Sequence, residues 1–247
     1  MPASALLIGA SIASLNLCTD EYLLLLARRD EIASVSFLSQ DPEESPLWRI
    51  ARRHPANRGS IEDVLTLRPD IVLTMSGGGR ATRLLAQRLR IRPVEIRSAA
   101  TLEDVASNLR TVAAALGEPK RAQPWLDRLA QIQRASPATT KDAMWLSGGG
   151  ATLAAGSVGT QWLRLAGLEQ RALPGGRASL ETLLVRPPAV LVWSQYRSAQ
   201  VSSGMRWLDH PIVRAAKSRR LTTDGRPWTC MGPLMIGEIE RLRGAAR

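Results

Sequence analysis

The chain has 247 residues, 45% of them hydrophobic, and a formal net charge of +11. This composition is typical of a globular protein with a substantial core and excludes a disordered chain. No run of about 18 apolar residues occurs, so the sequence predicts no transmembrane helix. The positive charge comes almost entirely from arginine, because the only lysines are Lys120, Lys141 and Lys217. The arginines are scattered singly or in pairs without interleaved aromatic residues, which disfavours nucleic-acid binding.

The N-terminal residues 1–13 are apolar and rich in small side chains, but they lack the basic start of a signal peptide. Two interpretations stay open. The segment is the remnant of a signal peptide whose start was placed too late, or it is the first buried strand, which we favour for residues 8–15.

Strand and helix patterns alternate along the chain. The predicted strands are residues 11–17, 31–37, 70–74, 93–96, 143–146, 189–193 and 219–222. The predicted helices are residues 20–27, capped by Thr19, and 61–67, 80–89, 101–116, 120–135, 158–166, 180–185, 205–208, 211–216 and 233–242. Strands separated by helices predict parallel sheets in an α/β fold.

An internal repeat predicts two lobes. Residues 60–73 and 179–192 both contain Ser-apolar-Glu, an apolar pair, Arg-Pro and a buried strand. We therefore expect an N-terminal α/β lobe at 1–117 and a C-terminal α/β lobe at 137–247, with residues 118–136 between them. A ligand cleft is expected between the lobes.

The candidate ligand-binding residues follow predicted strand ends, where ligands bind in open parallel sheets. They are Asn16, Cys18, Thr19, Asp20, Met75, Ser76, Gly77, Trp193, Ser194, Tyr196, Trp228, Thr229 and Cys230. The aromatic members, Trp193, Tyr196 and Trp228, would stack on a flat apolar ligand, although a structural role is equally compatible with each. Three other tryptophans, Trp125, Trp145 and Trp162, are expected in the core.

The two cysteines, Cys18 and Cys230, lie near opposite ends of the chain. Three interpretations remain open from the sequence: inert small side chains, a disulfide in an oxidising compartment, or side chains that contact ligand. A disulfide across the cleft would limit its opening.

Motifs for catalysis are absent from the sequence. The glycines at 148–150 do not have the spacing of a dinucleotide fingerprint and are expected to form a turn that lets backbone approach a ligand. No GxxxxGK or GxSxG motif occurs. The two histidines, His54 and His210, lie in separate segments, which argues against a zinc or manganese site. We therefore predict no catalytic residues, no metal ligands and no resident cofactor.

The order of these segments resembles the cobalamin and ferric-siderophore class of periplasmic solute-binding proteins of ABC importers. The resemblance rests on residues 14–20, on the paired Ser-x-Glu and Arg-Pro segments, on the glycine-rich start of the second lobe and on residues 228–233. It implies that the two lobes are joined by a single long connecting helix, at 118–136. It also implies a periplasmic, monomeric protein that captures a bulky iron or cobalt chelate, such as a ferric siderophore, haem or cobalamin. The excess of arginine favours an anionic chelate.

The resemblance also implies a partner. In this family one surface glutamate of each lobe meets the permease subunits, and the matching residues are Glu62 and Glu181. The alternative function is a nitrogenase-like metal-cofactor enzyme component of similar topology. Two cysteines are too few for an all-protein Cys₄ cluster site, which disfavours that alternative.

Overall fold

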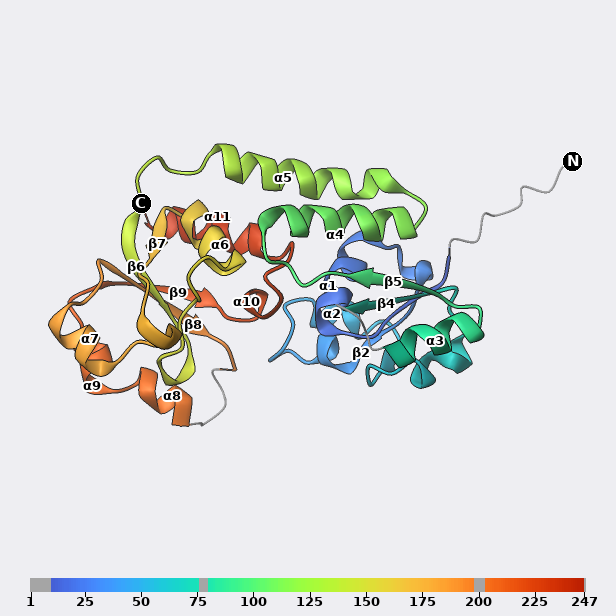
Figure 1. Cartoon of the computed structure of the whole chain (residues 1–247), viewed down its shortest axis with the longest axis horizontal. Coiled ribbons are helices and arrows are strands. Elements are labelled where there is room, and N and C mark those ends of the chain that lie inside the picture. The colour runs from blue at the N-terminus through green and yellow to red at the C-terminus, as the bar shows by residue number, and fades with distance from the viewer. Residues whose placement is uncertain (1–9, 76–79, 198–202, 247) are drawn as a thin grey trace, which may run out of the picture. The chain divides into compact units, whose positions relative to one another are not determined.

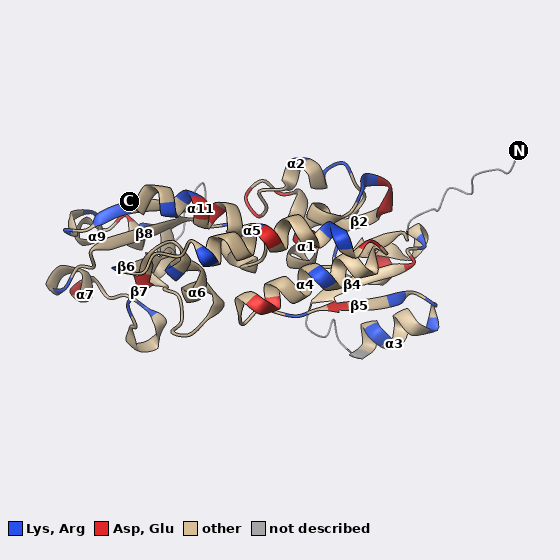
Figure 2. Cartoon of the chain, turned by 90° about the horizontal axis from the view of Figure 1, so that it is seen from above, with Lys and Arg blue, Asp and Glu red and all other residues tan. Residues whose placement is uncertain are grey.

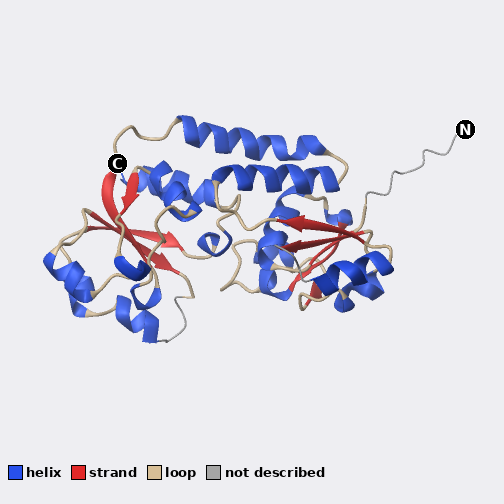
Figure 3. Cartoon of the chain, in the orientation of Figure 1, coloured by secondary structure: helices blue, strands red, loops and turns tan. Residues whose placement is uncertain are grey.

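The computed structural model describes residues 10–75, 80–197 and 203–246 (Figure 1). The chain divides into two compact units. Unit 1 takes the described parts of Met1–Ser98 and Ala106–Trp125, and unit 2 takes those of Ala99–Val105 and Leu126–Arg247. Each unit is an α/β structure with its own sheet (Figure 3).

Unit 1 is built on a five-stranded parallel sheet with the strand order β3-β2-β1-β4-β5. Its strands are β1 (Ile12–Ser14), β2 (Ile32–Ser36), β3 (Ala56–Asn57), β4 (Ile71–Met75) and β5 (Arg92–Ile96). Its α-helices are α1 (Leu17–Leu26), α2 (Trp48–Ala51), α3 (Arg80–Arg88) and most of α4 (Leu102–Ala115). Short 3₁₀ turns are η1 (Arg29–Glu31), η2 (Phe37–Gln40), η3 (Glu62–Leu67) and η4 (Pro119–Ala122).

Unit 2 is built on a four-stranded parallel sheet with the strand order β7-β6-β8-β9. Its strands are β6 (Lys141–Leu146), β7 (Leu168–Gln170), β8 (Val190–Gln195) and β9 (Arg219–Asp224). Its α-helices are α6 (Val158–Leu165), α7 (Leu180–Val185), α8 (Ser203–Leu208), α9 (Pro211–Ala215), α10 (Pro227–Cys230) and α11 (Met235–Ala246). Two 3₁₀ turns, η5 (Gly148–Gly150) and η6 (Pro174–Gly176), complete it.

Each unit has a core of its own. The central strands are buried on both faces, as parallel strands covered by helices are. In unit 1, β1 contributes Ile12 and Ala13 to the core, and α1 contributes Leu23. In unit 2 the largest fully buried side chain is Trp162 of α6, whose indole Nε1 donates to the backbone oxygen of Met231 at 2.9 Å. The predicted core positions of Trp145 and Trp162 are thus confirmed. Trp125, which was also expected in the core, is only half-buried, in the first turn of α5.

The helix expected at 120–135 begins later than its pattern indicated. Residues Pro119–Ala122 form η4, and α5 runs from Gln123 to Arg134. Pro124 lies in the first turn of α5, where the missing N–H removes no helical hydrogen bond. The division between the units falls inside α5, after Trp125. Within the described residues, no helix is long and apolar enough to span a membrane.

The predicted cap of the first helix was wrong. Thr19 lies inside α1, and the cap is Asn16, whose side-chain oxygen accepts from the backbone N–H of Cys18 at 2.8 Å. The Thr19 hydroxyl is instead buried against the Ser14 hydroxyl at 2.7 Å. The strand before it is accordingly shorter than predicted, and Cys18 lies in the first helical turn and not in a loop.

Candidate ligand-binding site

The carboxyl ends of the unit 1 strands meet at one edge of the sheet. The backbone N–H of Leu15, after β1, donates to the Leu73 carbonyl of β4 at 3.2 Å. The Asn57 side chain, at the end of β3, donates to the Ser14 carbonyl at 2.8 Å. Asn16 and Cys18 therefore lie at the carboxyl edge of this sheet, and both are half-buried. Sequence reasoning placed these two residues correctly at the edge where parallel sheets bind ligands.

Thr19 and Asp20 are at the same edge but are fully buried. Both Asp20 carboxylate oxygens accept from the Ser36 backbone N–H, at 3.1 and 3.0 Å, and the Ser36 hydroxyl also donates to this carboxylate. Burial raises the pKa of Asp20 to about 7, although hydrogen bonds from Ser14, Ser36 and Ser39 oppose this rise. Within unit 1, Asp20 fixes the end of β2 and presents no exposed surface to a ligand.

Met75 is the last residue of β4 and is half-buried at this edge. Its predicted companions, Ser76 and Gly77, lie outside the described residues. Phe37, the first residue after β2, is also at this edge and is half exposed, although its position was not among the predicted site residues. A lone aromatic residue directly after a buried strand is the signal that could have identified it.

In unit 2, β8 runs through Gln195, so Trp193 and Ser194 lie within the strand. Trp193 is half-buried, with the Arg220 guanidinium 5.3 Å from its ring centre. Tyr196 follows the strand and packs against the turn after β9. A Cβ at Gly225 would lie 2.7 Å from the Tyr196 backbone nitrogen, so this turn approaches β8 too closely for any larger residue.

Trp228 is a core residue of unit 2. It is 3% exposed, its ring centre lies 5.4 Å from that of Trp145, and its Nε1 donates to the Thr223 hydroxyl at 2.7 Å. The Thr223 hydroxyl in turn donates to the buried Glu238 carboxylate. The structure thus supports the structural role that the sequence left open for Trp228. The same short helix, α10, leaves Thr229 exposed and Cys230 half-buried at the carboxyl edge of β9.

Both cysteines, Cys18 and Cys230, are disulfide-bonded, and neither is a free thiol. The interpretation of the cysteines as inert thiols is therefore wrong. Their oxidised state is the one that secreted and periplasmic compartments maintain.

The glycine turn η5 follows β6 at the same edge of unit 2. Gly149 and Gly150 have φ values of 68° and 75°, in the region that favours glycine. The Arg177 guanidinium donates to the Gly149 carbonyl, and a Cβ at Gly204 would lie 3.3 Å from the Gly148 backbone. The turn was expected to let the backbone approach a ligand. In the structure its backbone instead closely approaches α8 of the same unit.

Glu62 and Glu181 are both exposed. Glu181 lies in the first turn of α7, whereas Glu62 begins η3, a 3₁₀ segment at the residues where a helix was predicted at 61–67. The Ser179 side chain caps α7 by accepting from the Thr182 N–H at 3.0 Å, and the Ser60 hydroxyl accepts more weakly from the Asp63 N–H at 3.3 Å. The internal repeat therefore places the two carboxylates at matching positions of the two units.

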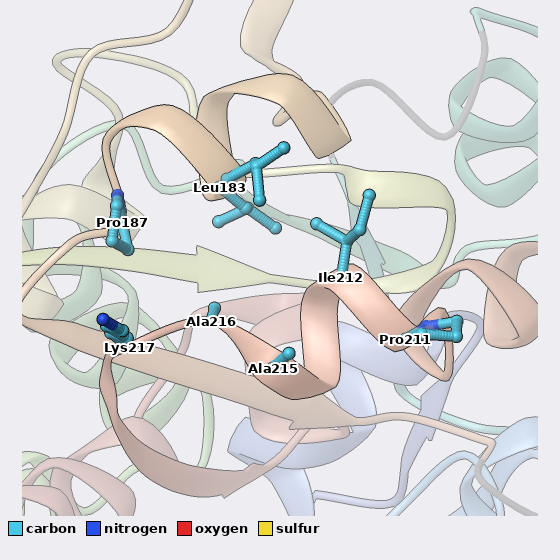
Figure 4. Close-up of a pocket in the computed structure, with 8 residues that line it drawn as sticks. Leu183, Pro187, Pro211, Ile212, Ala215, Ala216 and Lys217 are labelled. Atoms are coloured by element: carbon cyan, nitrogen blue, oxygen red, sulfur yellow. The ribbon is translucent and has the colours of Figure 1, made fainter.

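An apolar hollow of about 460 Å³ lies between α7 and α9 in unit 2 (Figure 4). Ile212 points from α9 toward Leu183 of α7, and Pro187 and Lys217 stand at one side. Pro187 and Lys217 precede β8 and β9 in the chain, so this side of the hollow is near the amino ends of the strands. It contains none of the predicted site residues, and we do not assign the ligand to it.

Three of the longer helices carry both acidic and basic residues. Acidic and basic residues both occur on α4, α5 and α11 (Figure 2). Among the described residues, no group of three or more His, Cys, Asp or Glu side chains is placed to hold a metal ion.

Two α/β units, each built on its own parallel sheet flanked by helices, are the architecture of two-lobed binding proteins. The chain belongs to the periplasmic binding protein family, whose model matches residues 12–220. The resemblance inferred from the sequence is thereby confirmed. No curated protein sequence matches the chain.

Solved structures of this class are similar over nearly the whole chain. The periplasmic haem-binding protein HutB of Vibrio cholerae has a TM-score of 0.73 at 18% identity, covering 96% of this chain and 98% of its own. A periplasmic haem-binding protein of Pseudomonas aeruginosa has a TM-score of 0.68 at 20% identity, covering 96% and 92%. The vitamin B12-binding protein BtuF of Vibrio cholerae has a TM-score of 0.65 at 20% identity, covering 96% of each chain. These likenesses establish the fold.

Proposed function

We propose that this protein is the substrate-binding component of an ABC importer, and that it captures a bulky metal chelate in the periplasm and delivers it to the permease. The chelate is a ferric siderophore, haem or cobalamin. The observation that carries the proposal is the family match over residues 12–220, together with candidate residues at the carboxyl edges of both sheets. Binding and release need no catalytic group, so the protein would act without chemical turnover.

The ligand would be held by the exposed or half-buried residues at these two edges. In unit 1 these are Asn16, Cys18 and Met75, and in unit 2 they are Tyr196, Thr229 and Cys230, with Trp193 beside them. Four other candidates are buried and would support the ligand-contacting residues without touching the ligand: Thr19, Asp20, Ser194 and Trp228. The names of the similar solved proteins, which bind haem and vitamin B12, support a metal chelate as ligand.

A thermal-shift panel tests this function. The purified protein is heated alone and with haemin, cyanocobalamin and ferric hydroxamate or catecholate siderophores. A ligand at a hundred times its Kd adds about 2.7 kcal/mol to the stability of the folded state and raises Tm accordingly. Zinc and manganese salts serve as controls and are expected to leave Tm unchanged.

The matched glutamates are proposed to dock on the two permease subunits. The double variant Glu62→Ala with Glu181→Ala is expected to reduce uptake roughly 2- to 30-fold, because two exposed ion pairs of about 0.2–1 kcal/mol each would be lost. Charged contacts of this kind set association rate and register more than affinity. Uptake into vesicles containing the transporter measures the loss, and calorimetry measures ligand affinity, which should not change.

The control for this experiment is the variant Glu95→Ala with Asp209→Ala. It also removes one exposed carboxylate from each unit, but each of these carboxylates pairs with an arginine of its own unit, Arg83 and Arg214. Equal uptake losses in the two double variants would indicate a general charge effect. A parallel loss of ligand affinity in the glutamate variant would also contradict docking.

A further inference from the structure

Phe37 is the only phenylalanine in the chain. It is 52% exposed, and it is the one aromatic residue among the large hydrophobic side chains that stand exposed in the described part of the chain. It begins η2 directly after β2, next to β1 in the sheet. An exposed aromatic ring is therefore presented at the carboxyl edge of unit 1, directly after the strand adjacent to the one that leads into Asn16 and Cys18.

The backbone on both sides of this ring is fixed by buried hydrogen bonds. Ser36, the residue before it, is 2% exposed and donates both its N–H and its hydroxyl to the Asp20 carboxylate. Ser39, two residues after it, is fully buried and donates its hydroxyl to the Ser36 carbonyl at 2.8 Å. With both serines anchored inward, the backbone that carries the Phe37 ring is fixed at this edge. A fixed backbone loses little conformational freedom when a ligand covers the side chain that it carries.

The anchor also connects Phe37 to the start of α1. Asp20 lies one turn after Asn16, the cap residue of α1, and two residues after Cys18. The buried carboxylate thus couples the position of the aromatic ring to the helix start that carries the half-buried candidate residues of unit 1.

Arginines lie on the next element. Gln40 of η2 donates to the carbonyls of Ala51 and His54, at 3.2 and 2.9 Å, and thereby fixes α2 against η2. The guanidinium carbons of Arg49, on α2, and of Arg52, the residue directly after α2, lie 4.6 and 4.7 Å from the centre of the Trp48 ring. Both arginines are exposed, so they place positive charge on the element packed against the Phe37 turn.

We infer that Phe37 is a ligand-contacting residue that stacks on the flat face of a tetrapyrrole ring. This inference rests on the proposed function and narrows it, because a planar ring offers a face for stacking and a hydroxamate siderophore does not. The neighbouring arginines suit a ring that carries carboxylate groups, such as the propionates of haem.

The test is a titration of haemin followed by its visible absorbance, with a ferric hydroxamate siderophore as the non-planar probe. Phe37→Ala is expected to raise the Kd for haemin roughly 3- to 12-fold, the range of an aromatic stacking contact. Phe37→Trp should bind within about 2-fold of the native protein, because stacking survives. Ile50→Ala, which removes another exposed apolar side chain of unit 1, is the matched control and should not change the Kd.

The outcomes separate the two proposals. Haemin binding that is equal in Phe37→Ala and the native protein overturns the stacking role alone, as does an equal loss in Ile50→Ala. Failure of the native protein to bind any tetrapyrrole or siderophore overturns the proposed function. Thermal denaturation of each variant shows whether it remains folded, and an exposed residue such as Phe37 should change Tm little.

Discussion

Replacing Arg121 by methionine is expected to lower the free energy of unfolding by about 3 kcal/mol, because the variant leaves a buried carboxylate without its main partner. Glu31 is 2% exposed, and the two terminal nitrogens of Arg121 donate to its two oxygens at 2.5 and 2.9 Å. Burial alone would raise the pKa of Glu31, but the hydrogen bonds and charge of Arg121 hold it below its usual value. Arg28, 2.8 Å from Glu31, remains in the variant and limits the loss.

The matched control is Arg164→Met. Arg164 also forms a two-fold hydrogen-bonded pair, with Glu169 at 2.8 and 2.7 Å, but both side chains are substantially exposed. Exposed pairs contribute about 0–1 kcal/mol. Urea denaturation of the two variants at neutral pH measures the difference. Equal stability losses would mean that the burial of Glu31 does not determine the strength of its ion pair.

Asp20→Asn is expected to flatten the dependence of stability on pH between about pH 4 and 7. The pKa of Asp20 is raised from 3.8 to about 7 by burial. Over that window the folded state keeps a proton that the unfolded state has lost, so the native protein loses stability as pH rises. The loss is complete above about pH 7. Each pKa unit corresponds to about 1.4 kcal/mol, so the total is at most about 4 kcal/mol.

Asparagine cannot ionise, and its side-chain oxygen can still accept from the Ser36 N–H. The variant should therefore lack the decline, while Asp41→Asn, which removes an exposed carboxylate just after η2, should keep it. Denaturant unfolding at several pH values between 4 and 8 compares the three proteins. Parallel profiles for Asp20→Asn and the native protein would show that Asp20 does not titrate in this range.

The main elements were predictable because their signals are local and repeated. Residues 180–185 have Ser179 as a cap and Pro187 shortly after their end, and the structure has α7 at those residues. The segments that the sequence did not predict are short. β3 has two residues and β7 has three, which is too few to show a periodicity of two, and both lie at sheet edges. Their identity as strands depends on pairing with β2 and β6.

Which side chains at a strand end face outward was not predictable. Trp228 and Phe37 both follow a strand, yet the Thr223 hydroxyl and the Trp145 ring hold the first in the core. The second is exposed because the serines on either side of it are buried. Both orientations also depend on residues distant in sequence, Trp145 for Trp228 and Asp20 for the turn that carries Phe37, so a pattern of neighbouring residues does not contain them.

Equilibrium dialysis against a panel of metal chelates, followed by recovery of the ligand, tests the proposed function most directly. The protein is dialysed separately against haemin, cyanocobalamin and ferric siderophores, and the bound fraction and the chemical identity of the recovered compound are both measured. We expect saturable binding of at least one chelate, recovered unchanged. Binding of none of them, or conversion of a bound compound to a product, would contradict a chelate-binding protein that delivers its ligand intact.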